Sequence, residues 1–228
     1  MNNQDFKFQE PRSIPVILLL DTSGSMNGSG NIGILNEAVH QMLADFSSQD
    51  DSNVAINVAI YSFGPDAKQV LPLMSASEAK DVYRDMSASG GTPLDGVLKL
   101  AKNQLIEDKE KLTSRSYRPT VVLVSDGMPN PGWEAALNDF KGTGRSSKCY
   151  RMALGIGFKA GDPSYKMLNE FVSDPEYLFT AAEASKIRSF FKFVTMSTIF
   201  RTSSQNPNMQ PAPQAIVTNG DDDDDDIF

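Results

Sequence analysis

The chain contains 228 residues, 40% of them hydrophobic, which fits one α/β domain with an additional segment. The formal net charge is −8, but Asp221–Asp226 supply six of the 29 acidic residues, so the rest of the chain, with 21 basic residues, is nearly neutral. Without a basic block, the body of the protein offers no basis for direct nucleic-acid binding.

Three features of the sequence bear on the cellular compartment. Met1–Pro11 is polar and contains two acidic residues, unlike a secretory signal peptide. No hydrophobic run approaches the roughly 18 residues that a membrane-spanning helix needs. Cys149 has no second cysteine with which to form an intrachain disulfide bond. We therefore expect a cytoplasmic protein without a membrane segment.

Hydrophobic periodicity predicts alternating strands and helices. In chain order these are a strand at Ser13–Leu20, a helix at Gly33–Phe46, strands at Asn53–Phe63 and Lys68–Leu73, helices at Glu78–Met86 and from Thr92 to about Lys111, a strand at Pro119–Ser125, a helix at Trp133–Phe140, a strand at Lys148–Ile156, a helix at Ser164–Val172, a strand at Tyr177–Thr180 and a helix at Ala182–Phe200. Ser13–Leu20 and Pro119–Ser125 are continuously hydrophobic, as is typical of strands covered on both faces. Lys68–Leu73 follows its predecessor closely enough to be an antiparallel edge strand. The alternation predicts an α/β fold with a doubly wound, mostly parallel sheet flanked by helices.

The end of this periodicity sets the expected domain boundaries. Residues 1–12 are expected to form an N-terminal extension and residues 13–200 the folded domain. Residues 201–220 are rich in Ser, Asn, Gln and Pro, a composition that buries too little hydrophobic surface to fold, so a flexible linker is predicted. Residues 221–228 are expected to form an acidic tip at the end of a disordered C-terminal tail.

Carboxylate and hydroxyl side chains follow two of the predicted strands and open one helix. Three of them lie at every second position directly after the first strand: Asp21, Ser23 and Ser25. Thr92 is expected to cap the long helix, ahead of Pro93 at the first helical position, and Asp126 follows a second buried strand. Ligands of open α/β sheets gather at the carboxyl ends of strands where the strand order reverses, so these loops are expected to meet. Their oxygens are hard ligands that suit Mg²⁺ or Mn²⁺ rather than zinc or copper.

The sequence resembles the von Willebrand factor A (vWA) family in three segments: Asp21-Thr22-Ser23-Gly24-Ser25-Met26, Gly90-Gly91-Thr92-Pro93-Leu94 and Val124-Ser125-Asp126-Gly127. The metal-ion-dependent adhesion site of that family reads Asp-x-Ser-x-Ser, a distant Thr and a distant Asp, and all five positions match. The resemblance implies a Rossmann-like vWA domain, hydroxyl ligands from the serines and the threonine, and aspartates that act partly through water. It also implies Mg²⁺, with Mn²⁺ as the alternative, and one coordination position left for water or for an Asp or Glu of a partner protein.

Two other interpretations of these loops remain open. The Asp-Thr-Ser-Gly-Ser turn is also compatible with an ordinary Asx-capped turn that binds no metal. Residues 28–33 have the G-x-G-x-x-G spacing of dinucleotide-binding loops, but they stand seven residues after the first strand and lack the acid expected further on. A flexible glycine-rich loop is the favoured interpretation of this segment.

The sequence offers little for catalysis. It has no P-loop motif, and Ser23 stands where phosphatases of the haloacid dehalogenase type have a second aspartate. Cys149 would need a histidine partner, and the sole histidine, His40, is expected at the surface of a helix. Mg²⁺ supports hydrolysis, but no general base stands out. We therefore expect a protein that is not an enzyme, with a Mg²⁺-dependent hydrolase as the alternative.

Several aromatic residues could either pack in the core or contact a partner. Trp133 follows the Asp126 loop and is either a contact residue at the rim of the metal site or, as the burial tendency of tryptophan favours, packed at a helix start. Phe190, Phe191 and Phe193 are expected to pack around the last helix rather than to form a binding site.

The acidic run ends in Ile227 and Phe228. This tail resembles the C-terminal tip of bacterial single-stranded-DNA-binding proteins, although Ile227 stands where that family has proline. The resemblance implies that Phe228 docks into an apolar pocket with a basic rim, and the acidic run would steer it there. A solubilising tail, or carboxylates that bind the chain's own metal, is the alternative.

Within the vWA family, the body resembles compact bacterial intracellular members of the tellurium-resistance (TerY-like) type. That resemblance implies a place in stress-response or defence systems, alongside protein kinases, phosphatases or AAA+ ATPases. The predicted function is a metal-dependent adaptor that binds another protein. A structural module that only positions the tail is a third interpretation.

Overall fold

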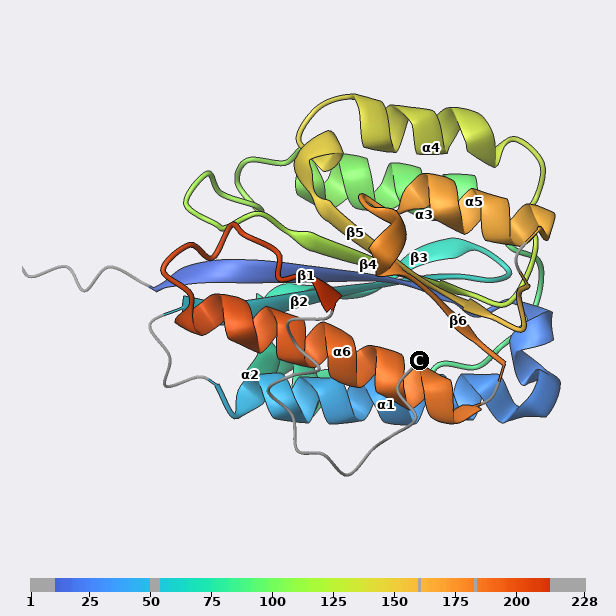
Figure 1. The fold of residues 1–228 in the computed structure, drawn as a ribbon, viewed down its shortest axis with the longest axis horizontal. Coiled ribbons are helices and arrows are strands. Elements are labelled where there is room, and N and C mark those ends of the chain that lie inside the picture. The colour runs from blue at the N-terminus through green and yellow to red at the C-terminus, as the bar shows by residue number, and fades with distance from the viewer. Residues whose placement is uncertain (1–10, 50–53, 160, 183, 214–228) are drawn as a thin grey trace, which may run out of the picture.

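The computed structural model describes residues 11–49, 54–159, 161–182 and 184–213 (Figure 1). Within these ranges the chain forms a central sheet with helices on both faces. The first ten residues of the expected N-terminal extension, the linker from residue 214 onward and the acidic tip with Ile227 and Phe228 lie outside the described residues.

Six strands form one sheet in the order β3-β2-β1-β4-β5-β6. Their bounds are β1 Arg12–Asp21, β2 Val54–Phe63, β3 Ala67–Ser75, β4 Thr120–Ser125, β5 Tyr150–Ile156 and β6 Leu178–Ala181. Neighbouring strands are parallel except for β2 and β3, which are antiparallel. The predicted doubly wound, mostly parallel sheet is confirmed, and so is its antiparallel edge strand.

The helices cover both faces of the sheet, and each face has its own hydrophobic cluster. One face carries α1 Asn31–Ser47, α2 Ala76–Val82 and α6 Ala184–Ser203, and the other carries α3 Leu94–Ala101, α4 Trp133–Gly142 and α5 Pro163–Phe171. Leu18 and Leu20 of β1 pack toward the first group of helices, and Ile17 and Leu19 toward the second. All four are fully buried, and each contributes roughly 1.5–3 kcal/mol, which is why this strand has no polar face. No helix in the described ranges is long and hydrophobic enough to cross a bilayer.

The segment between β1 and α1 is more regular than the flexible glycine-rich loop that was expected. Gly24–Gly30 forms a 3-10 helix, η1, that leads directly into α1. Met26 is fully buried in the cluster beneath it and anchors η1 to the domain. Gly30 makes the junction, because its φ of 72° lies in the left-handed region that favours glycine.

The helix predicted at Glu78–Met86 starts earlier and ends earlier. Ser75 and Glu78 form a capping box in which Ser75 Oγ accepts the Glu78 N–H at 3.3 Å. This cap places the first residue of α2 at Ala76, and the helix ends at Val82 because Tyr83 has an extended backbone.

The helix predicted from Thr92 to about Lys111 is shorter than expected. It comprises α3, which starts at Leu94, and a π-helical turn, η2 Lys102–Ile106. Glu107 follows directly, and its carboxylate accepts the backbone N–H groups of Arg145 and Ser146 at 2.7 and 3.0 Å. These long-range bonds end the helix by holding Glu107 against the loop before β5. The remaining short helices are η3 Ser146–Lys148 and η4 Pro175–Tyr177.

The last helix extends to Ser203, and the fully buried Arg201 explains why. The Arg201 guanidinium donates to Pro207 O at 2.8 Å, to Thr120 Oγ1 at 2.8 Å and to Arg118 O at 2.6 Å. Burial lowers the pKa of Arg201 to about 10, so the group still carries its charge at neutral pH. Arg201 therefore joins the end of α6 to the start of β4.

The chain after α6 remains packed on the domain, in contrast to the flexible linker that composition predicted from residue 201. The Tyr177 hydroxyl donates to Pro211 O at 3.1 Å, and Gln210 is 9% exposed. Residues 201–213 thus belong to the folded body. Composition gave no sign of this, because the segment is held by hydrogen bonds from distant side chains rather than by a hydrophobic pattern.

Replacing Arg201 with leucine is expected to lower the free energy of unfolding by about 3 kcal/mol, because two buried acceptors, Pro207 O and Thr120 Oγ1, and the part-buried Arg118 O lose their donor. Urea denaturation followed by circular dichroism measures this. The matched control is Arg188→Ala, which removes an exposed 2.7 Å ion pair with Glu37 and should cost less than about 1 kcal/mol. Equal losses in the two variants would contradict the anchoring role of Arg201.

Candidate metal centre

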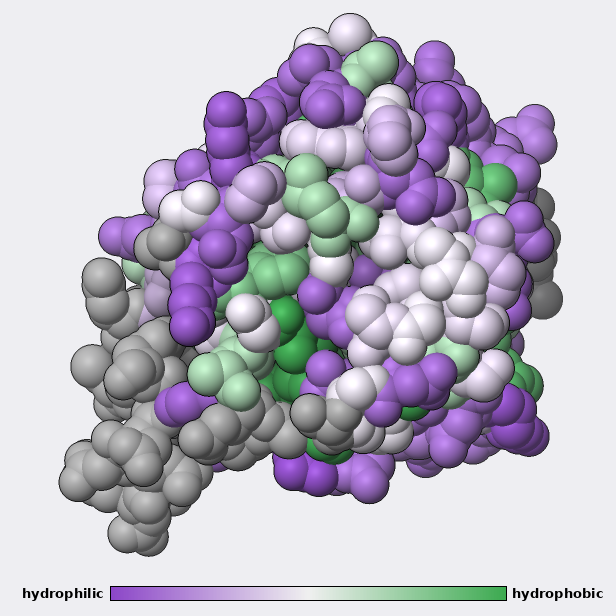
Figure 2. All heavy atoms as spheres, turned by 90° about the vertical axis from the view of Figure 1, so that its right-hand side faces the viewer, coloured by the Kyte–Doolittle hydropathy of each residue, from purple (hydrophilic) through white to green (hydrophobic). Residues whose placement is uncertain are grey.

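β1 and β4 are neighbours in the middle of the sheet, at the point where the strand order reverses. The loops after these strands lead to α1 on one face and to α4 on the other, and such a switch point at the carboxyl ends of the strands is where open α/β sheets bind ligands. Asp21 is the last residue of β1, and Asp126 directly follows β4. Figure 2 looks onto this edge, whose mostly hydrophilic surface surrounds a small hydrophobic hollow.

Asp21 is fully buried, and both of its carboxylate oxygens accept hydrogen bonds. Oδ1 accepts the Ser23 N–H at 2.8 Å, and this bond fixes the turn after β1. Oδ2 accepts the Ser125 hydroxyl at 2.6 Å, which ties the end of β1 to the end of β4. The carboxylate is therefore held in one orientation before any ligand arrives.

The other predicted ligands lie next to it. Ser23 Oγ and Ser25 Oγ share a hydrogen bond of 2.9 Å, and Ser25 Oγ donates to Asp126 Oδ1 at 2.6 Å. Thr92 Oγ1 lies nearby. A Cβ atom added to Gly127 would lie 3.6 Å from Ser25 Oγ and 4.0 Å from Thr92 Oγ1, so both hydroxyl oxygens are close to this glycine. The structure thus brings the five predicted side chains together from three separate loops.

Both carboxyl groups are in surroundings that disfavour their charged forms. Burial raises the pKa of Asp21, hydrogen bonds from Ser125 and Ser23 oppose this, and the charge of Asp126 raises the pKa further. Burial also raises the pKa of Asp126, against a hydrogen bond from Ser25. Two desolvated carboxylates beside one another are stabilised by a bound cation.

The spacing of the oxygens fits a small divalent cation. An octahedral ion with metal–oxygen distances of 2.0–2.1 Å places adjacent ligand oxygens about 2.9 Å apart. The separations of 2.9 Å between Ser23 and Ser25 and of 2.6 Å between Ser25 and Asp126 are close to this value. No three His, Cys, Asp or Glu side chains come together anywhere in the described ranges, so a metal at this edge depends on hydroxyl ligands.

Backbone contacts hold the three loops around the five side chains. Gly24 N–H donates to Gly90 O at 3.0 Å, and Ser89 N–H donates to Thr22 O at 2.8 Å. Gly90 has a φ of 75°, and a Cβ there would lie 2.6 Å from backbone atoms of Pro65. A glycine is required at this position, for conformation and for space.

Sequence reasoning missed Asn130, which positions Thr92. Asn130 Oδ1 accepts the Thr92 N–H at 3.2 Å, and Asn130 N–H donates to Thr92 O at 2.9 Å. The expected helix cap at Thr92 is wrong, because Pro93 occupies that position and α3 has no side-chain cap. The Thr92 hydroxyl is consequently not used to cap the helix. An asparagine four residues after Asp126 was the available signal, but its partner is distant in the sequence.

The residues considered for catalysis are engaged elsewhere. Cys149 precedes β5 at the opposite edge of the sheet, and burial raises the pKa of its thiol to about 12, so it stays protonated at neutral pH. His40 is exposed on α1, as expected, and forms a 2.8 Å hydrogen bond with Asp85 Oδ1.

The aromatic residues have the structural roles that burial tendencies favoured. Trp133 is 8% exposed and packs in the cluster beneath α4 rather than at the rim of the site. Phe190, Phe191 and Phe193 are buried in the cluster beneath α6. The exposed hydrophobic side chain near the five ligands is Met128, two residues after Asp126 and 49% exposed.

Comparison with known proteins agrees with this fold. The sequence model of the von Willebrand factor type A domain matches residues 16–193, which is more than three quarters of the chain. No curated protein gives a match.

Solved structures share the fold at low sequence identity. The vWF domain of the type V pili tip protein Mfa5 from Porphyromonas gingivalis is 11% identical, with 87% of this chain and 99% of that chain covered and a TM-score of 0.69. The pilus adhesin SpaC from Lactobacillus rhamnosus GG is 17% identical, with 82% and 30% covered and a TM-score of 0.66. Proximal thread matrix protein 1 from the mussel byssus, in a form described as having a zinc-occupied MIDAS motif, is 17% identical, with 81% and 46% covered and a TM-score of 0.60. The chain spans less than half the length of the latter two.

The substitution Gly90→Ala is expected to lower the free energy of unfolding by about 1–3 kcal/mol, because the new Cβ strains the backbone and meets Pro65. Gly28→Ala is the control, since a Cβ at Gly28 meets no atom within 4 Å. Chemical denaturation compares the two variants. Equal stability would mean that the loop does not need the backbone conformation seen at Gly90.

Asp126→Asn separates the stability of the fold from metal binding. Since burial raises the pKa of Asp126, its charge at pH 7 destabilises the folded state, so asparagine should leave the metal-free protein as stable as the wild type or slightly more stable. Saturating MgCl₂ should raise the melting temperature of the wild type, with about 2.7 kcal/mol gained at 100 times the dissociation constant, and should not stabilise the variant. Thermal unfolding with and without Mg²⁺ measures both effects. An equal response of the two proteins would contradict the site.

Proposed function

Because the chain belongs to the von Willebrand factor type A domain family, we propose that it is a module that binds another protein through a divalent metal held at the carboxyl-end edge of the sheet. The ligands of this metal would be the side chains that the loops bring together: Asp21, Ser23, Ser25, Thr92 and Asp126. An Asp or Glu of the partner protein would complete its coordination. The observation that carries the proposal is the continuous set of short oxygen contacts from Ser23 through Ser25 to Asp126.

The charge of the site makes partner binding depend on the metal. Asp21 and Asp126 give the site two negative charges when ionised, which repel an incoming carboxylate. A divalent cation neutralises both, and the neutral hydroxyls of Ser23, Ser25 and Thr92 add no negative charge. The loaded site therefore accepts one more carboxylate, which the unloaded site repels.

The identity of the metal follows from the ligands. Hydroxyl and carboxylate oxygens favour Mg²⁺, with Mn²⁺ as the alternative. The mussel protein with a zinc-occupied motif supports a divalent ion at a site of this type, and zinc is therefore the competing ion to test.

The surface around the site is suited to contact with a protein. Ser25 is exposed and Asp126 is partly exposed, so part of the site faces solvent. Met128 adds an exposed, flexible hydrophobic side chain at the same edge. A partner that supplies a carboxylate and a small apolar neighbour would fit both features.

The cellular setting is part of the proposal. The TerY-like resemblance supports an adaptor in a bacterial stress-response or defence complex, with a kinase, a phosphatase or an AAA+ ATPase as partner. A cytoplasmic location and the anchoring role of Ile227 and Phe228 remain predictions from the sequence. The alternative, a Mg²⁺-dependent hydrolase, would use the same ligands, but Cys149 and His40 are engaged elsewhere.

Affinity capture from a cell extract with the full-length chain tests the adaptor function. A specific partner should be retained with Mg²⁺ and lost with a chelator, and the substitution Asp21→Ala should reduce its recovery at least tenfold. The control is Asp81→Ala on α2, an exposed acid away from the metal ligands, which should retain the partner. Retention by the Asp21 variant would contradict the proposal, and Mg²⁺-dependent turnover of a phosphoester lost on Asp126→Ala would favour the hydrolase.

A further inference from the structure

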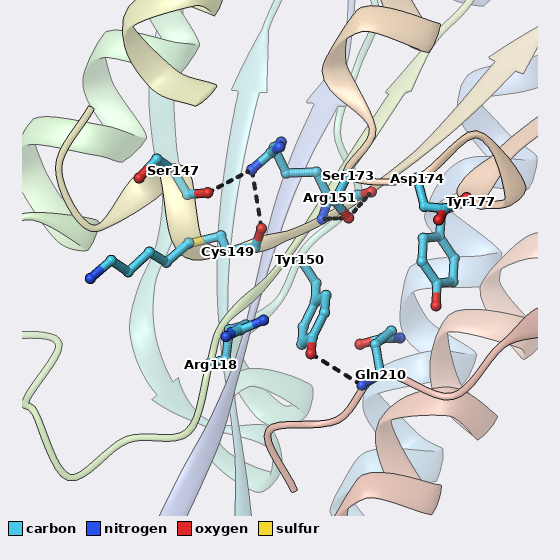
Figure 3. Close-up of a pocket in the computed structure, with 10 residues that line it drawn as sticks. Arg118, Ser147, Cys149, Tyr150, Arg151, Ser173, Asp174, Tyr177 and Gln210 are labelled. Carbon is cyan, nitrogen blue, oxygen red and sulfur yellow. Dashed lines mark hydrogen bonds between the residues drawn. The ribbon is translucent and has the colours of Figure 1, made fainter. Parts of the chain in front are cut away.

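A second polar site lies at the amino ends of the strands, opposite the candidate metal centre, at the start of β5. It is a pocket of about 470 Å³ (Figure 3). Its polar and aromatic lining comes from the segment before β4, from η3 and β5, from η4, and from the chain after α6: Arg118, Lys148, Tyr150, Arg151, Tyr177 and Gln210. None of these residues belongs to the candidate metal centre.

The pocket lining carries more positive than negative charge, with three basic residues and one acid. Arg118 and Lys148 are exposed, and neither forms an ion pair with any described residue. Arg151 is buried, and its guanidinium donates only to backbone carbonyls, among them Phe171 O at 2.7 Å. The one acid in the lining is Asp174, whose carboxylate is engaged in accepting the Glu176 N–H at 3.0 Å.

The arginines also lie close to one another. The guanidinium carbon of Arg118 is 4.8 Å from the ring centroid of Tyr150, and that of Arg201 is 5.4 Å from the same centroid. The charge of Arg118 contributes to lowering the pKa of Arg201, after the larger effect of burial. An anion beside Arg118 would relieve this repulsion.

Gln210 indicates what kind of anion the pocket takes. Its side chain is 9% exposed, and neither amide atom has a hydrogen-bond partner among the described residues. In Figure 3 this amide lies between Tyr150 and Tyr177. A buried amide without partners destabilises the folded state, and a peptide backbone, which offers both a donor and an acceptor, would satisfy it. The lining therefore fits an acidic peptide.

The chain supplies such a peptide from a short distance. Gln210 is three residues from Pro213, where the described structure ends, and the bond from Tyr177 to Pro211 O holds this segment beside the pocket. The eight residues from Pro213 to Asp221 span at most about 28 Å when extended. We propose that Asp221–Asp226 binds in this pocket of its own chain, with its carboxylates on Arg118 and Lys148 and its backbone on Gln210.

This contact is expected to be weak in isolation and effective in the intact chain. Exposed charges are screened over a Debye length of about 8 Å at physiological ionic strength, so its affinity should fall as salt is added. A short linker gives the tethered segment an effective concentration of about 1 mM, which compensates for modest intrinsic affinity. The pocket would then be closed to acidic segments of other proteins until a stronger competitor arrives.

The test uses a fluorescent peptide with the sequence of residues 218–228 and the full-length chain, with a chelator present. Fluorescence anisotropy measures peptide binding to the wild type and to a variant in which Asp221–Asp226 are all asparagine. The variant should bind the peptide at least tenfold more tightly than the wild type, because its own tail no longer competes. Equal affinities would overturn the proposal. Binding that appears only when Mg²⁺ replaces the chelator would overturn it as well, since the tail would then bind at the metal centre.

Substitutions in the asparagine variant locate the binding surface. Arg118→Glu with Lys148→Glu should weaken peptide binding at least tenfold, whereas Lys68→Glu with Lys80→Glu, which changes exposed lysines on β3 and α2, should change it less than twofold. Gln210→Leu, which preserves the charges, should also weaken binding. Equal effects of the two charge-reversed pairs would overturn the pocket assignment, and a wild-type dimer that dissociates in the asparagine variant would overturn binding within one chain.

Discussion

The fold and its site both depend on one buried carboxylate. Asp21 lies at the end of the central strand. One of its carboxylate oxygens accepts the Ser23 N–H in the turn that carries two of the proposed ligands, and the other accepts the hydroxyl of Ser125, the last residue of β4. A charged group in that position is costly unless a cation is near, and the pKa of Asp21 is raised accordingly. The parallel sheet brings Asp126 to the same edge, so the same fold that creates the electrostatic cost also assembles the oxygens that would relieve it.

The sequence predicted the parts of the fold that depend on local pattern. The continuous hydrophobic run of β1 is explained by helices on both faces, and the Asp-x-Ser-x-Ser spacing corresponds to one turn on which Asp21, Ser23 and Ser25 lie together. Parts held by distant partners could not be predicted. Asn130 fixes Thr92 by contacts across 38 residues, and Arg201 holds residues that composition alone assigned to a linker.

The two edges of the sheet carry opposite charge. The carboxyl ends of the strands present Asp21 and Asp126, while the amino ends of β4 and β5 present Arg118, Lys148 and the lining of the basic pocket. The net charge of the body, which is near zero, conceals this separation. In the two proposals above, an acidic segment binds at either end of the strands, through a metal at one end and through arginine and lysine at the other.

Arg201 also limits the motions open to the last helix. Sliding α6 along its axis by one turn, about 5.4 Å, would pull the guanidinium away from Thr120 Oγ1 and Arg118 O at the start of β4. A bend in the first half of α6 leaves both bonds intact. Any rearrangement that accompanies partner binding should therefore pivot about the C-terminal turn of this helix, which acts as the fixed point of the domain.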